Sequence, residues 1–155
     1  MNINRAMKSA LSETQLDCSL NPSLKSIADS GFDRRNGCYV LRGLSKTTNV
    51  TRESFPDCTG YECFLNSLHV EDYDSVSPLA QAILLVKEVF VVWNAEQRTE
   101  RLTAVVSADE FSVVTRFHGQ RLGEQWLSEN LEGYDDPVMS INSDEDIVAQ
   151  IAMAR

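Results

Sequence analysis

The sequence predicts a single α+β domain over residues 1–155, with helices packed on an antiparallel sheet that is built around a central β-hairpin. Its 155 residues are the length of one domain, and its 43% hydrophobic content is ordinary for a globular protein. Some segments carry apolar residues at helical spacing, and others alternate as strands do. The predicted order is helices, strand, two helices, hairpin, helix, strand and helix, a mixture that is typical of α+β proteins.

The N-terminal third is predicted to contain two short helices and one strand. Residues 1–35 form a helical N-terminal extension in this prediction, with one short helix near the start. A second short helix runs from Pro22 to Ala28, because proline is favoured in the first turn of a helix. Residues 37–44 (GCYVLRGL) are predicted as a strand, and the polar residues 45–56 as a loop.

Two helices follow. Residues 57–69 (DCTGYECFLNSLH) are predicted as a helix because four of their apolar residues have helical spacing: Tyr61, Phe64, Leu65 and Leu68. Residues 78–94 are predicted as a central, buried helix that is apolar on every face. Its main stripe consists of Leu79, Ile83, Val86, Phe90 and Trp93. Periodicity leaves open whether the VFVVW stretch within it is a strand.

The central hairpin is predicted from residues 102–107 (LTAVVS) and 111–118 (FSVVTRFH), which are rich in β-branched residues and separated by a short loop. Strand alternation places Phe111, Val113, Thr115 and Phe117 on the packing face. Arg116 and His118 then share the other face.

The C-terminal part is predicted as helix 123–134, strand 137–142 and helix 144–152, the last capped by Ser143 or Asp144. In helix 123–134 the apolar side docks on the sheet, so Trp126, Leu127 and Leu131 are expected to be buried with Phe117, Phe90 and Trp93. Its opposite side would project a row of carboxylates from Glu124, Glu129 and Glu132, which Asp135 and Asp136 continue.

The chain is acidic, with 23 Asp and Glu against 14 Lys and Arg and a net charge of −9. This balance argues against nucleic-acid binding, because such domains usually carry a basic face. Residues 121–155 hold eight acidic groups against Arg121 and Arg155, and residues 57–74 hold five with no Lys or Arg. The bias suits either a solvated surface or a surface that attracts a basic partner, and charge alone favours the first. The candidate partner contacts are Glu124, Glu129, Glu132, Asp135, Asp136, Glu71, Asp72 and Asp74.

Cysteine and hydropathy patterns predict a cytoplasmic protein without a membrane partner. The N-terminus has no apolar core of signal-peptide length, so the four cysteines (Cys18, Cys38, Cys58 and Cys63) are expected to be free thiols. The longest apolar run is interrupted by charges and is too short to span a bilayer. Cys58 and Cys63 with His69 match no zinc spacing, so no metal and no cofactor is expected.

Arg116 and His118 raise the alternative of an enzyme. An arginine and a histidine near a strand end can hold an anion or act as acid and base. The sequence has no Gly-rich phosphate loop and no nucleophile elbow to accompany them. We therefore expect a structural His118 that bonds a neighbouring loop or Glu124. A small hydrolytic or acid/base enzyme using His118, Arg116 and Glu124 is the alternative function.

Two segments resemble the immunity proteins of bacterial contact-dependent growth inhibition (CDI) systems. Residues 116–141 (RFHGQRLGEQWLSENLEGYDDPVMSI) are similar to their C-terminal half, with an Arg-Phe-His strand end followed by Arg, Gly-Glu, Trp-Leu, Leu-Glu and Tyr. Residues 61–73 (YECFLNSLHVEDY) are similar to their Glu-x-x-x-Asn-x-x-His-x-x-Asp-Tyr segment, which falls on Glu62, Asn66, His69, Asp72 and Tyr73. Together the two segments cover about a quarter of the chain.

The resemblance implies a cytoplasmic protein that binds and neutralises the toxic C-terminal domain of a sibling cell's surface effector. It implies no catalysis by this chain and no direct contact with nucleic acid. Some toxins of these systems are nucleases, including ribonucleases, which tend to be basic because they grip phosphates. An acidic inhibitor is the physical counterpart of such a toxin. Within the matching segments, the polar residues Glu62, Asn66, His69, Arg116, His118 and Arg121 are candidates for internal networks that hold the fold together.

Overall fold

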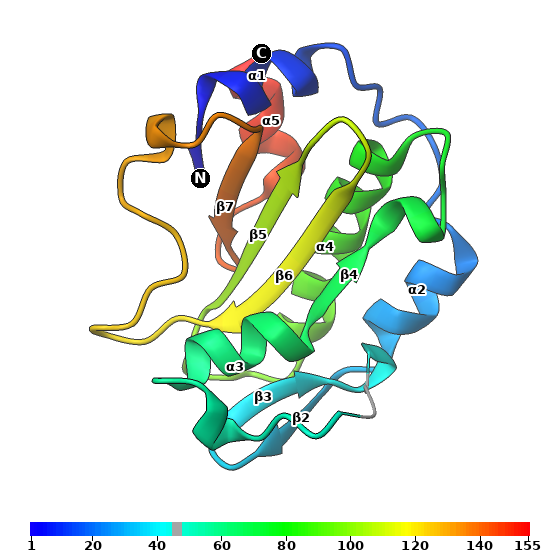
Figure 1. The fold of residues 1–155 in the computed structure, drawn as a ribbon. Helices are drawn as coiled ribbons and strands as arrows, with labels where there is room; N and C mark the ends of the chain where they lie inside the picture. Colours follow the sequence, from blue (N-terminus) through cyan, green and yellow to red (C-terminus); the bar gives the residue numbers. More distant parts are fainter. Residues whose placement is uncertain (45–47) are drawn as a thin grey trace.

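A computed structural model describes residues 1–44 and 48–155, so residues 45–47 of the predicted loop 45–56 lie outside it. Its centre is a five-stranded antiparallel sheet with the order β1-β7-β5-β6-β4. The strands are β1 (Asn2–Ile3), β4 (Ser67–His69), β5 (Leu102–Ala108), β6 (Val113–Gly119) and β7 (Val138–Asn142). Helices pack against this sheet (Figure 1), which confirms the predicted α+β class.

The central hairpin is confirmed, and its connection is longer than predicted. β6 begins at Val113 because the Asp109 carboxylate organises the turn and accepts hydrogen bonds from the backbone N–H groups of Phe111 and Ser112. Phe111 therefore lies outside the strand and is 83% exposed instead of packing on the core.

Helix α4 (Pro78–Ala95) covers one face of the sheet, as the sequence predicted, and the VFVVW stretch is helical. Its side chains pack against alternate residues of β5, β6 and β7, including Ala104, Phe117 and Met139. Phe90 and Trp93 are buried as expected. Helix α4 is long and apolar enough to cross a membrane by length and composition alone, and half of it is buried inside this fold.

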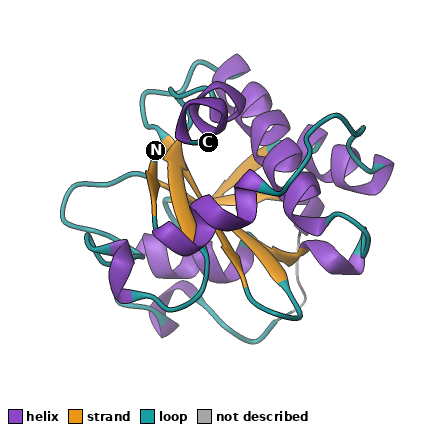
Figure 2. Cartoon of the chain, turned by 90° about the horizontal axis from the view of Figure 1, so that it is seen from above, coloured by secondary structure: helices purple, strands orange, loops and turns teal. Residues whose placement is uncertain are grey.

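Residues 1–35 are an integral part of the domain. β1 pairs with β7, and the helices α1 (Arg5–Ser12) and α2 (Pro22–Asp29) confirm the two short helices of the prediction. Met7, Leu11 and Leu24 are fully or almost fully buried in the main core. Figure 2 shows the strands in the interior with helices packed against them and long loops at the periphery.

A second, two-stranded sheet is formed by β2 (Phe32–Arg35) and β3 (Cys38–Leu41). The turn residues Asn36 and Gly37 both have positive φ, as the Asn-Gly pair of a tight hairpin turn requires. The predicted strand 37–44 is shorter than expected, because Arg42–Leu44 form a 3-10 helix.

The predicted helix 57–69 is correct only for α3 (Cys58–Leu65), after which the chain becomes β4. Asn66 causes the change. Its side chain accepts a hydrogen bond from Leu41 N and donates to the carbonyl oxygens of Tyr39 and Phe117, which draws the chain out of the helix toward β3 and β6. A 3-10 helix, Val70–Asp72, follows β4, and another, Arg52–Ser54, precedes α3.

The C-terminal strand is confirmed and the last helix is shorter than predicted. α5 (Ile147–Ala154) starts three residues later than expected, because Asp146 is its N-cap and accepts from Val148 N and Ala149 N. The predicted caps have other places: the Ser143 hydroxyl accepts from Leu102 N, and Asp144 pairs with Arg101.

The expectation of four free thiols is wrong for two of them. Cys38 on β3 and Cys58 at the start of α3 form a disulfide with a Cα–Cα distance of 5.5 Å, because the hairpin packs directly beside this helix. Cys18 and Cys63 are free. Burial raises the pKa of the Cys63 thiol to about 12, so it is an inert core group.

Candidate functional site

The face of the sheet opposite α4 is the open face, and it carries the residues that the sequence singled out. Cross-strand pairing sets Ser140, Val105, Arg116 and Ser67 in one row across β7, β5, β6 and β4. Residues 120–137, which we call the cover segment, connect β6 to β7 along this face (Figure 1). Leu127 and Leu131 of the cover segment pack with Val105 and Val138 in a small cluster of their own.

The predicted helix 123–134 is wrong. The cover segment is irregular apart from the 3-10 helix Leu131–Gly133, and Gly123 has a φ of 78° that a helix does not allow. Glu124, Glu129 and Glu132 therefore do not form a row. Leu131 is buried as expected and Leu127 is partly buried, but Trp126 is 43% exposed, contrary to the prediction.

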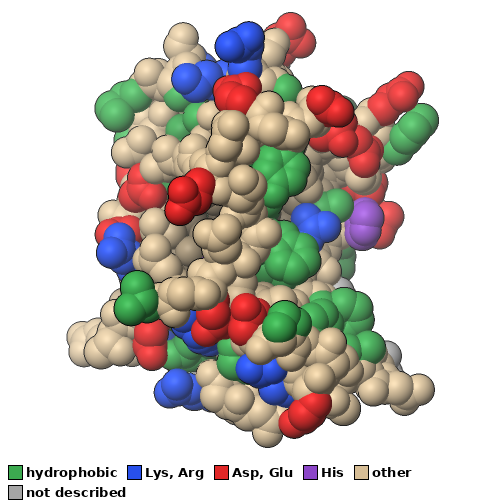
Figure 3. All heavy atoms as spheres, turned by 60° about the vertical axis from the view of Figure 1, so that its left-hand side comes forward, with side chains coloured by type: hydrophobic (Ala, Val, Ile, Leu, Met, Phe, Trp, Pro, Cys, Tyr) green, Lys and Arg blue, Asp and Glu red, His purple; other side chains and the backbone are tan. Residues whose placement is uncertain are grey.

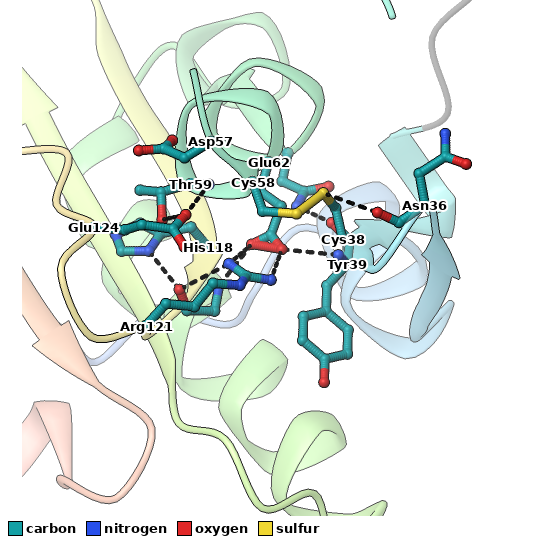
Figure 4. Close-up of polar contacts among 12 residues, drawn as sticks. Asn36, Cys38, Tyr39, Asp57, Cys58, Thr59, Glu62, His118, Arg121 and Glu124 are labelled. Carbon is teal, nitrogen blue, oxygen red and sulfur yellow. Dashed lines mark hydrogen bonds and ion pairs between the residues drawn. A yellow bond between two sulfur atoms is a disulfide. The ribbon is translucent and has the colours of Figure 1, made fainter. Parts of the chain in front are cut away.

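Arg121 fixes the beginning of the cover segment through a buried ion pair. Its guanidinium donates to both carboxylate oxygens of Glu62, a residue that is fully buried (Figure 4). Glu62 also accepts from Tyr39 N at 2.8 Å and from Gly119 N at 2.7 Å. One carboxylate thus joins the two-stranded sheet, the end of β6 and the cover segment.

Glu124 makes a second anchor, on α3. Its Oε1 accepts from Thr59 N at 3.2 Å and from the Thr59 hydroxyl at 3.1 Å, next to the N-cap Asp57 (Figure 4). A carboxylate is favourable there because the first N–H groups of a helix lack internal partners. Glu124 therefore holds the cover segment in place instead of projecting toward a partner.

Asn4 makes the third anchor and was missed from the sequence. Its buried side chain donates to the carbonyl oxygens of Leu131, Tyr134 and Asp136, at 3.5, 3.3 and 2.8 Å. Its Oδ1 accepts from Met7 N, as the N-cap of α1, and from Val138 N. An Asn directly before a helix was the local signal, but its partners in the cover segment lie more than 120 residues away in the chain.

His118 is buried next to this network and has a structural partner. Its Nδ1 lies 3.0 Å from the carbonyl oxygen of Gly119, the next residue, so its hydrogen bond goes to the end of β6, where the neighbouring loop starts, and not to Glu124. Burial lowers the pKa of His118 below its usual value, which keeps the ring neutral near pH 7. Nδ1 then carries the proton that it donates, and Nε2 is the unprotonated nitrogen.

The residues predicted to form internal polar networks are only partly brought together. Glu62 and Asn66 do act jointly, because both clamp β3 to β6. His69 is not part of that clamp: it lies exposed on β4 with Nδ1 2.9 Å from Glu71. Arg116 is also separate, since the only hydrogen-bond partner of its side chain among the described residues is the Ser107 hydroxyl.

Two shallow grooves flank the cover segment on the open face. One, of about 230 Å³, contains His118, Glu124, Thr103 and Asn142 in its lining. The other, of about 260 Å³, is lined by Arg116, Trp126, Tyr134, Asp135, Asp136 and neighbouring aliphatic residues. The three residues of the predicted acid/base set are thus divided between the grooves.

The second groove has aromatic walls and a cation at its centre. The Arg116 guanidinium lies 5.9 Å from the centroid of the Trp126 ring. Tyr134 is 38% exposed, and its hydroxyl accepts from Ser128 N, which fixes the ring. Figure 3 shows hydrophobic side chains on this side of the molecule, with a basic side chain between them and acidic side chains around them.

The eight acidic candidates divide into engaged and unengaged groups. Glu124, Glu132, Glu71 and Asp74 accept hydrogen bonds from the backbone, and so serve the fold. The others are exposed, and none of the ion pairs or hydrogen bonds within residues 1–44 and 48–155 involves their carboxylates. They are Glu129, Asp135, Asp136 and Asp72.

In the described part of the chain, one group of side chains has the proximity of metal ligands: Cys38, Cys58 and Glu62, whose donor atoms lie within 4.8 Å of one another. The two sulfur atoms are bonded to each other, and the Glu62 oxygens are occupied by Arg121 and two backbone N–H groups. This group therefore works as a covalent and ionic brace. Cys63 and His69, which the sequence placed beside Cys58 as possible ligands, are not part of it.

Comparison with known proteins identifies one family to which the sequence is similar. No curated protein and no solved structure gives a significant match to this chain. A family model matches residues 2–152, which is nearly the whole domain, including the cover segment and its anchors. The chain therefore belongs to the uncharacterized protein PM0498 family.

Proposed function

We propose that this chain is a cytoplasmic immunity protein that binds and neutralises the toxic C-terminal domain of a CDI effector, and that the open face is its binding surface. The observation that carries the proposal is the exposed pair Trp126 and Tyr134, held beside Arg116 and bordered by acidic groups without ion-pair partners in the described structure. Trp, Tyr and Arg are the residues that most often dominate the binding energy of protein interfaces.

The charge of this surface supports a basic partner. Glu129, Asp135 and Asp136 are exposed on the cover segment, and none of the described ion pairs neutralises them. A basic nuclease toxin, such as a ribonuclease, would be attracted to such a surface, because complementary charge raises the association rate and selects the partner.

The anchoring of the cover segment supports tight binding. Asn4, Arg121 and Glu124 fix an irregular segment of 18 residues at both its ends, so that little order has to be gained on association. Preorganised surfaces bind more tightly because fewer side chains and loops lose freedom in the complex.

The resemblance to CDI immunity proteins supports the same proposal in two ways. Glu62, Asn66 and Arg121 of the matching segments hold the fold together, so these positions suit a common architecture. Trp126 and Tyr134 of the same segments point outward enough to contact a partner. We assign the binding role to these outward residues.

An acid/base enzyme is the alternative, and one observation favours it: His118 and Glu124 line the same groove. Catalysis there would require Nε2 of His118 to exchange a proton with a substrate in that groove. His118→Ala distinguishes the two functions, because it would abolish turnover by an enzyme and leave toxin binding at the Trp126 groove intact.

The test is co-expression with the C-terminal domain of the protein encoded immediately upstream, which the proposal predicts to be a CDI effector. The wild-type chain should restore the growth of cells that express this domain, and Trp126→Ala should fail to do so at equal protein level. Val91→Ala is the matched control, because Val91 is an exposed hydrophobic residue on α4, behind the sheet. Equal protection by all three proteins would place the interface elsewhere, and no protection by the wild type would contradict the proposal.

A further inference from the structure

Arg116 is a cation with no ion-pair partner among the described residues. It is partly buried in the middle of the open face, and it belongs to none of the ion pairs within residues 1–44 and 48–155. Its one hydrogen bond runs from Nη1 to the Ser107 hydroxyl at 3.2 Å. The other described Lys and Arg side chains outside these ion pairs are exposed, except Arg52, whose guanidinium donates to the carbonyl oxygen of Phe55.

The position of the guanidinium leaves its donors available. A guanidinium has five N–H donors, and Arg116 uses one of them on Ser107. Its Cζ atom lies over the Trp126 ring, 5.9 Å from the ring centroid, and none of the hydrogen bonds within the described residues uses the other four N–H groups, so a bidentate acceptor could bind them. Because the site is partly buried, a bond to an anion there would be less screened than an ion pair on the open surface.

Asp135 and Asp136 line the same groove, but neither carboxylate comes within 4 Å of the guanidinium. They and Glu129 are exposed, so their preferred partners are Lys and Arg side chains. A polyanion such as RNA would be repelled by these acids. A protein surface with one carboxylate among basic side chains could instead pair the carboxylate with Arg116 and the basic side chains with the surrounding acids.

We propose that Arg116 receives a carboxylate of the toxin domain, so that the partner surface has an Asp or Glu side chain surrounded by Lys and Arg. This inference rests on the proposed function and specifies the chemistry of its partner. The surface around a nuclease active site fits the same pattern, since a carboxylate base works there among phosphate-binding cations.

The first test compares dissociation constants by titration calorimetry, using the toxin domain encoded immediately upstream. Arg116→Gln should raise the Kd by about 30-fold or more, which corresponds to the loss of a desolvated charge pair. Arg116→Lys should weaken binding less, because it keeps the charge and loses the planar fork. Arg35→Gln is the matched control: Arg35 is exposed on β2, outside the open face, and the substitution changes the net charge equally.

The second test is a charge reversal. Arg116→Glu should abolish binding, and reversing a single Asp or Glu of the toxin domain to Lys should restore at least about tenfold in affinity. Circular dichroism of each variant checks the fold, which should persist because the Arg116 side chain belongs to no ion pair of the described residues and has one hydrogen bond, to the Ser107 hydroxyl.

The outcomes separate the two proposals. If the wild type binds the toxin domain and Arg116→Gln binds equally well, the role of Arg116 is refuted and the immunity function stands. The same holds if no reversal in the toxin domain rescues Arg116→Glu, or if Arg116 is required for binding a short single-stranded RNA probe. If the wild type does not bind the toxin domain, the proposed function fails together with this inference.

Discussion

Replacing Glu62 by glutamine should lower the free energy of unfolding by about 3–5 kcal/mol, the usual cost of breaking a buried ion pair from one side. Glu62 is fully buried and accepts four hydrogen bonds: two from Arg121 and one each from Tyr39 N and Gly119 N. Glutamine keeps the shape, but its amide NH₂ must face one of these N–H groups. That group loses its acceptor, which alone costs about 1–3 kcal/mol, and the guanidinium loses its counter-charge.

Urea unfolding followed by circular dichroism measures this change. Glu110→Gln is the control, because Glu110 is exposed at the hairpin tip and should change stability by no more than about 0.5 kcal/mol. Arg121→Gln and the double variant complete a thermodynamic cycle, in which the second substitution should cost much less than the first. A loss below about 1 kcal/mol for Glu62→Gln would refute the claim that this carboxylate joins the two sheets and the cover segment.

Three further predictions concern the braces of the fold. Asn4→Ala should destabilise the protein by about 2–4 kcal/mol in urea unfolding, because it removes an N-cap and the buried bonds to the cover segment; an unchanged midpoint would contradict that anchor. Replacing Cys38 and Cys58 by serine should lower the free energy of unfolding by about 3 kcal/mol. Mass spectrometry after thiol alkylation of rapidly quenched cells should show the disulfide, and two alkylated thiols would show that it is reduced in the cell. Burial lowers the pKa of His118 in the folded state, so the unfolded state takes up a proton more readily than the folded state does. The stability of the protein should therefore be fully present above the unfolded pKa of about 6.5 and should fall as the pH drops below it. His118→Gln should flatten this part of the stability profile, and a wild-type profile that does not fall between pH 7.5 and 5.5 would contradict the buried neutral ring.

Local periodicity was sufficient where short-range packing decides the structure. Helix α4 is apolar on every face, and the β5–β6 hairpin alternates along both strands, so both were predicted close to their observed bounds. The sequence also identified the acidic residues of the cover segment, and it placed Arg116 near the end of the hairpin.

The cover segment shows what local patterns cannot contain. Trp126, Leu127 and Leu131 have helical spacing, but the backbone around them is bound by Asn4, 127 to 132 residues away, and Glu124 binds Thr59, 65 residues away. These distant contacts outweigh the weak preference for a helix, and they turn Trp126 toward solvent. Asn66 ends α3 in the same way, through bonds to β3 and β6.

Titration of the chain with the toxin domain encoded immediately upstream, for wild type, Trp126→Ala and Val91→Ala, tests the central claim most directly. Wild type and Val91→Ala should bind with equal affinity, and affinity should fall as salt is added, because exposed acids steer a basic partner. Trp126→Ala should lose about 2 kcal/mol or more, a Kd increase of about 30-fold, while keeping its circular dichroism spectrum. Absence of binding by the wild type, or undiminished binding by a folded Trp126→Ala, would contradict the account.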